Sequence, residues 1–173
     1  ALESWAWDGC NGEQAKVEVY ARAAQVELFI NGKSVGKKKV KKCRANFNTT
    51  YQDGEITAVS YDENGREINR YSLQTAGKET VLQVRPEEKT VKPEGLAFIQ
   101  LQYTDSKGIW KPMEKHNIKV TVENGVLKGL GSPAPYVKGN YTDHTVATYY
   151  GEAMAVVQAD GNGPVKVTVA DEE

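Results

Sequence analysis

Acidic side chains are the first groups to weigh for chemistry, because the chain has 23 Asp and Glu residues. Two carboxyls that face each other in a cleft, about 5–10 Å apart, can act as acid and nucleophile in hydrolysis. The carboxyls here fall in turns or on the outward positions of alternating segments. Glu87 and Glu88 are expected in solvent, and residues 171–173 are terminal. We therefore expect no hydrolytic site in this chain alone.

Histidines and cysteines give no pattern for a metal site or for nucleophilic catalysis. The chain has two of each, namely His116, His144, Cys10 and Cys43. Their spacing does not match a zinc site, and no G-x-S-x-G motif is present. We expect both histidines at the surface or at strand edges, and no cofactor. The cysteines are interpreted as reduced, mostly buried thiols of a cytoplasmic protein, with a single disulfide as the alternative.

Two Asp-rich segments have some likeness to calcium loops. They are residues 62–65 (Asp-Glu-Asn-Gly) and 160–163 (Asp-Gly-Asn-Gly). Neither has the downstream Glu that completes such a loop. We predict hairpin turns at both, with an irregular calcium site as the alternative.

Aromatic residues form the one constellation that could bind carbohydrate, because aromatic faces stack on sugar rings. Core or rim packing is the competing interpretation of this set, which comprises Trp110, Tyr103, Tyr136, Tyr141, Tyr149 and Tyr150. Trp5 and Trp7 stand two apart, so an extended chain places them on one face. They could form a sugar platform, but we favour an anchor that docks on a neighbouring domain. In that case both rings would be exposed here.

A basic run, Lys37–Lys39 with Lys41, Lys42 and Arg44, stands out in a chain of net charge −1. Nucleic-acid binding would need interleaved aromatics and a basic domain, and the net charge gives no attraction to an anionic membrane. Lysines on an edge strand prevent aggregation between strands, which is the favoured interpretation. Contact with an acidic protein surface is the alternative.

Alternating apolar and polar residues dominate the chain, and helical spacing is almost absent. Turn dipeptides such as Asn31-Gly32, Asn64-Gly65 and Asn124-Gly125 separate the runs. We predict strands at 16–21, 25–30, 33–40, 43–49, 55–62, 66–73, 80–85, 96–104, 117–123, 126–130, 144–149, 152–159 and 164–170. Residues 131–143 are predicted to form a long loop.

This strand spacing predicts an all-β fold of two tandem immunoglobulin-like β-sandwiches. The boundary is placed within residues 75–78, which gives domains 1–78 and 79–173. No apolar run has the length of a membrane-spanning helix.

Several segments of the first half resemble the region after the catalytic barrel in glycoside hydrolase family 2. They are Trp5-Ala6-Trp7, residues 8–12 (Asp-Gly-Cys-Asn-Gly), residues 17–20 (Val-Glu-Val-Tyr), residues 26–36 (Val-Glu-Leu-Phe-Ile-Asn-Gly-Lys-Ser-Val-Gly) and residues 73–77 (Leu-Gln-Thr-Ala-Gly). Residues 95–99, 103–105, 124–131 and 150–157 are similar to the family's final immunoglobulin-like domain.

The resemblance implies a β-galactosidase, or alternatively a β-glucuronidase, whose two catalytic glutamates lie on a barrel domain. No residue here matches those glutamate motifs, so none is assigned. The chain is then a non-catalytic C-terminal region that supports the barrel or builds an oligomer of the parent, and the barrel of the same chain is its partner. Its Trp5 and Trp7 would face that barrel. A carbohydrate-binding module and an adhesion repeat of a surface protein are the alternatives.

Overall fold

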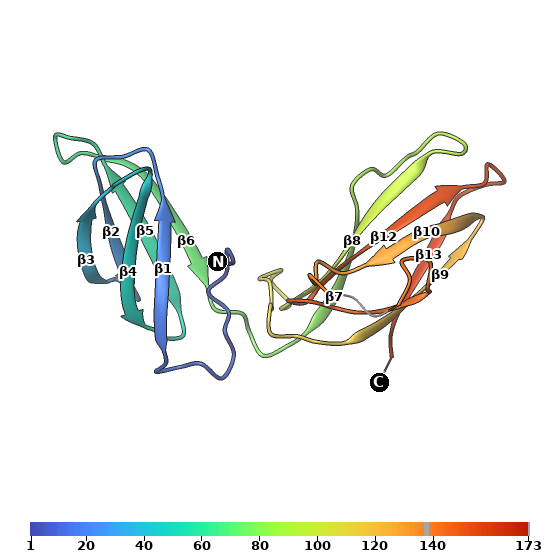
Figure 1. Cartoon of the computed structure of the whole chain (residues 1–173), viewed down its shortest axis with the longest axis horizontal. Helices are drawn as coiled ribbons and strands as arrows, with labels where there is room; N and C mark the ends of the chain where they lie inside the picture. Colours follow the sequence, from blue (N-terminus) through green and yellow to red (C-terminus); the bar gives the residue numbers. More distant parts are fainter. Residues whose placement is uncertain (137–138, 173) are drawn as a thin grey trace. The chain divides into compact units, whose positions relative to one another are not determined.

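The structure is a computed structural model that describes residues 1–136 and 139–172. The chain divides into two compact units, Ala1–Ala76 and Gly77–Glu173. Every regular element within the described residues is a β-strand, and each unit consists of two sheets (Figure 1). The predicted fold class of two tandem immunoglobulin-like sandwiches is confirmed. None of the described segments forms a helix with the length and apolar character needed to cross a membrane.

The first unit has six strands, all paired antiparallel. One sheet has β1 beside β4, and the other has the order β3-β2-β5-β6. The bounds are β1 (Gln14–Tyr20), β2 (Gln25–Ile30), β3 (Lys33–Lys39), β4 (Arg44–Thr50), β5 (Glu55–Tyr61) and β6 (Glu67–Gln74). Alternation along β2 buries Val26, Leu28 and Ile30, which form a core with Phe47 of β4.

Asn31 and Gly32 form the two-residue turn between β2 and β3, as predicted. Both have positive φ, 49° and 76°, which is the geometry of the type I′ turn that suits twisted hairpins. The Asn31 side chain does more than tolerate this backbone. Its Nδ2 donates to Asp53 O at 2.9 Å, and its Oδ1 accepts from Glu55 N–H at 2.8 Å. The turn is thereby fastened to the loop between β4 and β5.

The second unit has two sheets, with orders β10-β12-β8-β7 and β11-β9-β13. The bounds are β7 (Val81–Pro86), β8 (Leu96–Thr104), β9 (Asn117–Glu123), β10 (Gly125–Gly131), β11 (Thr145–Ala147), β12 (Glu152–Ala159) and β13 (Lys166–Glu172). Inward residues of β8, β9 and β12, such as Leu101, Val120 and Ala155, make the core. The long loop predicted at residues 131–143 is observed between β10 and β11, except that residues 137–138 lie outside the described part.

Candidate functional site

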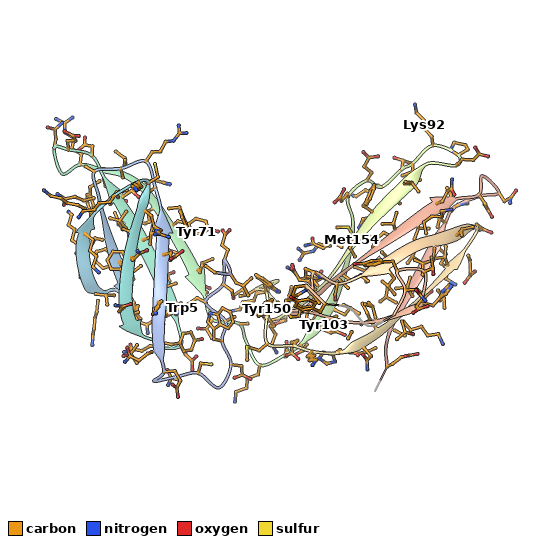
Figure 2. The ribbon with its side chains drawn as sticks, viewed as in Figure 1. Trp5, Tyr71, Lys92, Tyr103, Tyr150 and Met154 are labelled. Atoms are coloured by element: carbon orange, nitrogen blue, oxygen red, sulfur yellow. The ribbon has the colours of Figure 1, made fainter. Side chains whose placement is uncertain are left out.

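Three of the predicted aromatic residues come together on the second unit. The rings of Tyr149 and Tyr150 meet edge to face, with centroids 4.5 Å apart and planes at 64°. Trp110 Nε1–H donates to the carbonyl of Tyr150 at 2.8 Å. The two tyrosines remain 36% and 40% exposed, so this aromatic cluster presents ring surface to solvent. Tyr150 is labelled in Figure 2.

A strained turn produces the aromatic cluster. Tyr149 and Glu152 exchange two backbone hydrogen bonds of 3.1 Å, which closes a two-residue turn between β11 and β12. Its central residues, Tyr150 and Gly151, have φ of 52° and 69°. Glycine is required at the second position, because a Cβ there would press on Lys111 O. A bulky tyrosine in the left-handed region costs on the order of 1 kcal/mol or more, and such strain clusters at functional surfaces.

Tyr103 is not part of that surface, so the expectation that it contacts a ligand is wrong. It is 2% exposed, because Ile99, Leu101 and Tyr103 alternate on the inner face of β8. Its ring stacks on His116 at 4.4 Å between centroids. Burial is the main cause of the raised pKa of its phenol, and the hydrogen bond to Asp171 raises this pKa further. Tyr103 points inward because side chains alternate between the two faces of β8, and its aromatic type alone does not determine this orientation.

Tyr136 and Tyr141 lie elsewhere on the long loop. Tyr136 is 94% exposed and directly precedes the undescribed residues. Tyr141 lies against Gly131, where a Cβ would clash with the tyrosine ring. It lines a groove of about 510 Å³ together with Gln100 and Met154, and this groove includes no member of the aromatic cluster. The predicted set of six tyrosines and tryptophans is therefore split over separate surfaces.

A charged network surrounds His116. Its Nδ1 lies 3.1 Å from Asp171 Oδ2 and its Nε2 lies 3.0 Å from Glu114 Oε2. Lys111 Nζ approaches the other oxygen of Glu114 at 2.8 Å. Burial would raise the pKa of Glu114, but hydrogen bonds from Lys111, His116 and Thr80 outweigh it and lower the pKa to about 2. Such a carboxylate stays ionised at neutral pH, so Glu114 is suited to cross-linking strands and loops and not to donating a proton as a general acid.

Trp5 is buried in the first unit, so the expected exposure of its ring is wrong. It is 4% exposed and packs on Tyr51 with ring centroids 4.8 Å apart. Its Nε1–H donates to Gln52 O at 3.0 Å. Trp7 is half-buried against the same core. Both tryptophans lie in a segment without regular strand structure, where their sequence spacing does not fix a shared face.

The Tyr51 hydroxyl is the centre of a polar hub in the first unit. It accepts from Trp7 N–H at 3.2 Å and donates either to Trp5 O or to Thr75 Oγ1, both 3.3 Å away. Thr75 Oγ1 also donates to Trp5 O at 3.1 Å. Burial is the main cause of the raised pKa of Tyr51. The hub ties residues 5–7 to the residue that follows β6, which sequence reasoning did not predict.

The two Asp-rich segments form turns, and the two cysteines are free thiols. Asp62 and Asp160 accept backbone N–H bonds within their own turns, from Asn64 and Asn162 at 2.8 and 2.9 Å. Among the residues that the structure describes, no group of His, Cys, Asp and Glu is arranged to hold a metal ion. The two cysteines are unpaired. Cys43 is exposed in the turn between β3 and β4, which corrects the expectation of a mostly buried thiol.

Comparison with known proteins gives two family matches. A family model described as Glycoside hydrolase family 2 C-terminal domain 5 matches residues 82–173. A second, described as a Domain of unknown function (DUF4982), matches residues 12–69. Together they cover most of both units.

Curated relatives are much longer than this chain. "Beta-galactosidase BoGH2A" of Bacteroides ovatus is 27% identical over 173 residues, which is 96% of this chain and 20% of that protein. A "Putative beta-glucuronidase" of Formosa agariphila is 41% identical over 69 residues, 38% of this chain and 7% of its own length. The chain spans about a fifth or less of the length of these relatives.

Solved structures agree on the fold. A family 2 glycosyl hydrolase of Bacteroides cellulosilyticus superposes with a TM-score of 0.91 at 27% identity, covering 99% of this chain and 24% of that one. A β-glycosidase of Bacteroides vulgatus gives a TM-score of 0.84 at 23% identity, with 98% and 22% covered. At that identity the second likeness concerns the fold alone.

Proposed function

The chain belongs to glycoside hydrolase family 2 through its C-terminal domain 5, and we propose that it is the non-catalytic C-terminal region of a larger family 2 glycosidase. The proposal rests on the length of this chain compared with that of its relative. Nearly all of the chain aligns with only a fifth of a protein named as a β-galactosidase. A β-galactoside is therefore the proposed substrate of the parent, with a β-glucuronide as the next choice.

We assign catalysis to the catalytic barrel of the parent, because the ionisable side chains of the charged network form ion pairs and hydrogen bonds with one another. Glu114 is engaged by Lys111 and His116, and Asp171 by His116 and Tyr103. A retaining or inverting glycosidase needs one carboxyl kept protonated near neutral pH, whereas Glu114 has a pKa of about 2. The network is suited to structural cross-linking.

Support of the barrel is the proposed role of the first unit, and the Tyr51 hub is the feature that suits it. The hub fastens residues 5–7, the loop after β4 and Thr75 to one hydroxyl group. These bonds fix the positions of the first and last segments of the unit relative to each other. Trp7, which is half-buried, is the proposed contact with the barrel, and Trp5 contributes by holding that segment in place.

Activity assays test this proposal. The chain alone and the full-length protein are each incubated with nitrophenyl β-galactoside and nitrophenyl β-glucuronide. We expect turnover by the full-length protein alone. In the full-length protein, Tyr51→Phe and Trp7→Ala should lower the temperature at which activity is lost, while KM for the small substrate stays unchanged. Turnover by the chain alone would overturn the proposal.

Carbohydrate binding is the second candidate function, and the strained Tyr150 turn is the observation that favours it. Backbone strain persists where the surrounding structure enforces it, and it clusters at functional sites. Here the strained turn holds two exposed tyrosine rings beside Trp110. Titration with galactan oligosaccharides should quench tryptophan fluorescence in the wild-type chain but not in Trp110→Phe. A flat titration of the wild-type chain removes this candidate.

A further inference from the structure

A groove of about 620 Å³ lies on the first unit beside the turn that connects β3 in one sheet to β4 in the other. Five of its eight lining residues carry a positive charge, and none is acidic. An exposed tyrosine from β1 forms part of its wall. The residues that matter for its chemistry are Tyr20, Lys38, Lys39, Lys41, Lys42 and Arg44. We call this surface the basic groove.

The turn at the basic groove is strained. Lys41 and Arg44 exchange two backbone hydrogen bonds of 3.0 Å, so Lys42 and Cys43 form a two-residue turn. Both have positive φ, 51° and 59°. This is the position where Asn-Gly is preferred, and the chain uses that pair between β2 and β3. Two non-glycine residues in the left-handed region therefore retain strain in a turn beside this charged surface.

Edge protection explains only part of this surface. β3 is an edge strand in the order β3-β2-β5-β6, which is a position where lysines disfavour pairing with another chain. That role does not require Lys41, Lys42 and Arg44 to lie with Tyr20 around one hollow. It also does not account for a lysine in the strained turn.

The charges of the groove are only partly compensated within the protein. Arg44 Nη1 lies 3.5 Å from Glu18 Oε1, and Glu18 also accepts from the Tyr20 hydroxyl at 2.6 Å. Lys38 Nζ donates to the backbone oxygen of Asn46. No hydrogen bond or ion pair to Lys39, Lys41 or Lys42 side chains is found within the described residues, and Lys39, Lys41 and Lys42 are exposed. The groove therefore suits a ligand that brings several negative charges.

We propose that the basic groove binds an acidic polysaccharide, whose uronate or sulfate groups pair with Lys39, Lys41 and Lys42 while a sugar ring stacks on Tyr20. The choice of a glycan over an acidic protein rests on the proposed function and on the aromatic wall. Tyr20 is 67% exposed, and its hydroxyl is oriented by Glu18. An exposed ring beside cations offers a sugar both stacking and charge pairing.

Isothermal titration calorimetry of the whole chain tests the proposal with four probes. Polygalacturonate carries uronates, dextran sulfate carries sulfates, dextran is neutral, and poly-glutamate represents an acidic protein. We expect binding of polygalacturonate, of dextran sulfate or of both, with weakening at high salt, and no binding of dextran. The charged polymer that binds more tightly identifies the anionic group.

Three variants separate the contributions. Lys39→Gln with Lys41→Gln and Lys42→Gln should weaken polysaccharide binding about tenfold or more. Tyr20→Ala should weaken polysaccharide binding while leaving any weak attraction of poly-glutamate unchanged. The matched control, Lys33→Gln with Lys89→Gln and Lys92→Gln, removes the same charge outside the groove and should bind as the wild type does (Lys92 is labelled in Figure 2).

A fourth variant excludes misfolding as the cause. Lys42→Asn with Cys43→Gly installs the preferred turn residues, so it should raise Tm by roughly 4–8 °C while it weakens polysaccharide binding. Equal binding of all polyanions with no effect of Tyr20→Ala, or no binding at all, would overturn the proposal. Neither result bears on the proposed non-catalytic role, which fails only if the chain alone turns over a glycoside.

Discussion

The hydroxyl of Tyr103 donates to Asp171 Oδ2 at 2.9 Å, and this bond fastens β13 to β8 inside the second unit. The same carboxylate oxygen lies 3.1 Å from His116 Nδ1, and the His116 ring stacks on Tyr103. The last strand, β13, pairs with β9 in one sheet, whereas β8 belongs to the other. Tyr103 therefore links the two sheets through a polar contact in addition to core packing.

Tyr103→Phe should destabilise the second unit by about 1 kcal/mol. The substitution keeps the ring and its stacking on His116 and removes only the hydroxyl that bonds Asp171. Urea denaturation of the chain, followed by circular dichroism, measures the loss. Tyr136→Phe is the control, because it also removes a tyrosine hydroxyl from the second unit but its side chain is 94% exposed. Equal stability of the two variants would show that the Tyr103 hydroxyl does not link the sheets.

Acid should destabilise the second unit through Glu114. Its pKa is about 2 in the folded chain, below the ordinary value near 4.5, so its stabilising contribution is complete above about pH 4.5 and disappears as the pH falls toward 2. We expect a loss of about 2–3 kcal/mol over that window. Asp105 adds a loss of the same sign, since three backbone N–H groups outweigh its burial and lower its pKa.

Glu114→Gln measures the Glu114 contribution to this acid sensitivity. The amide does not titrate, so the stability curve between about pH 5 and pH 2 should become flatter, and stability at neutral pH should fall to a similar extent. Glu88→Gln is the control, since Glu88 is exposed in a loop outside the network. A curve for Glu114→Gln with the same slope as the wild type would contradict the assignment.

The strands could be predicted from the sequence because the fold depends on period-two alternation and on turn dipeptides. Each predicted range lies within about two residues of an observed strand. Asn31-Gly32 marks a type I′ turn because these residues tolerate positive φ. The two unforeseen turns, at Lys42-Cys43 and Tyr150-Gly151, have the same geometry with at least one residue that does not favour it. Tertiary context overrides the local preference there.

Side-chain roles could not be predicted from residue type. The tyrosine at 103 follows two inward residues on the same strand, so its burial could have been inferred from the alternation of Ile99, Leu101 and Tyr103. The burial of Trp5 had no such signal, because it depends on contacts with Tyr51 and Gln52, which are more than 40 residues away in sequence. The basic groove likewise brings Tyr20 of β1 together with the turn between β3 and β4.

Asn31→Gly should cost the first unit about 1–2 kcal/mol although glycine fits the turn. Glycine accepts the φ of 49° without strain but adds conformational entropy to the unfolded chain, so the loss beyond that of the Asn64→Gly control reports the two side-chain hydrogen bonds to Asp53 O and Glu55 N–H. Asn64→Gly is the control within the same unit, in a turn that Asp62 caps. Thermal unfolding of both variants makes the comparison, and equal Tm values would mean that the Asn31 amide is dispensable.

Tyr150→Asn should stabilise the second unit by about 1 kcal/mol, because asparagine is among the residues that tolerate the left-handed region. Loss of the edge-to-face contact with Tyr149 reduces this gain in stability. The contact contributes only modestly, because both rings are partly exposed. Tyr149→Asn loses the same contact and relieves no strain, so it should destabilise. Thermal unfolding should therefore give shifts of opposite sign for the two variants. If both lower Tm equally, the Tyr150 backbone stores no strain, and the reason for assigning a binding role to the aromatic cluster is lost.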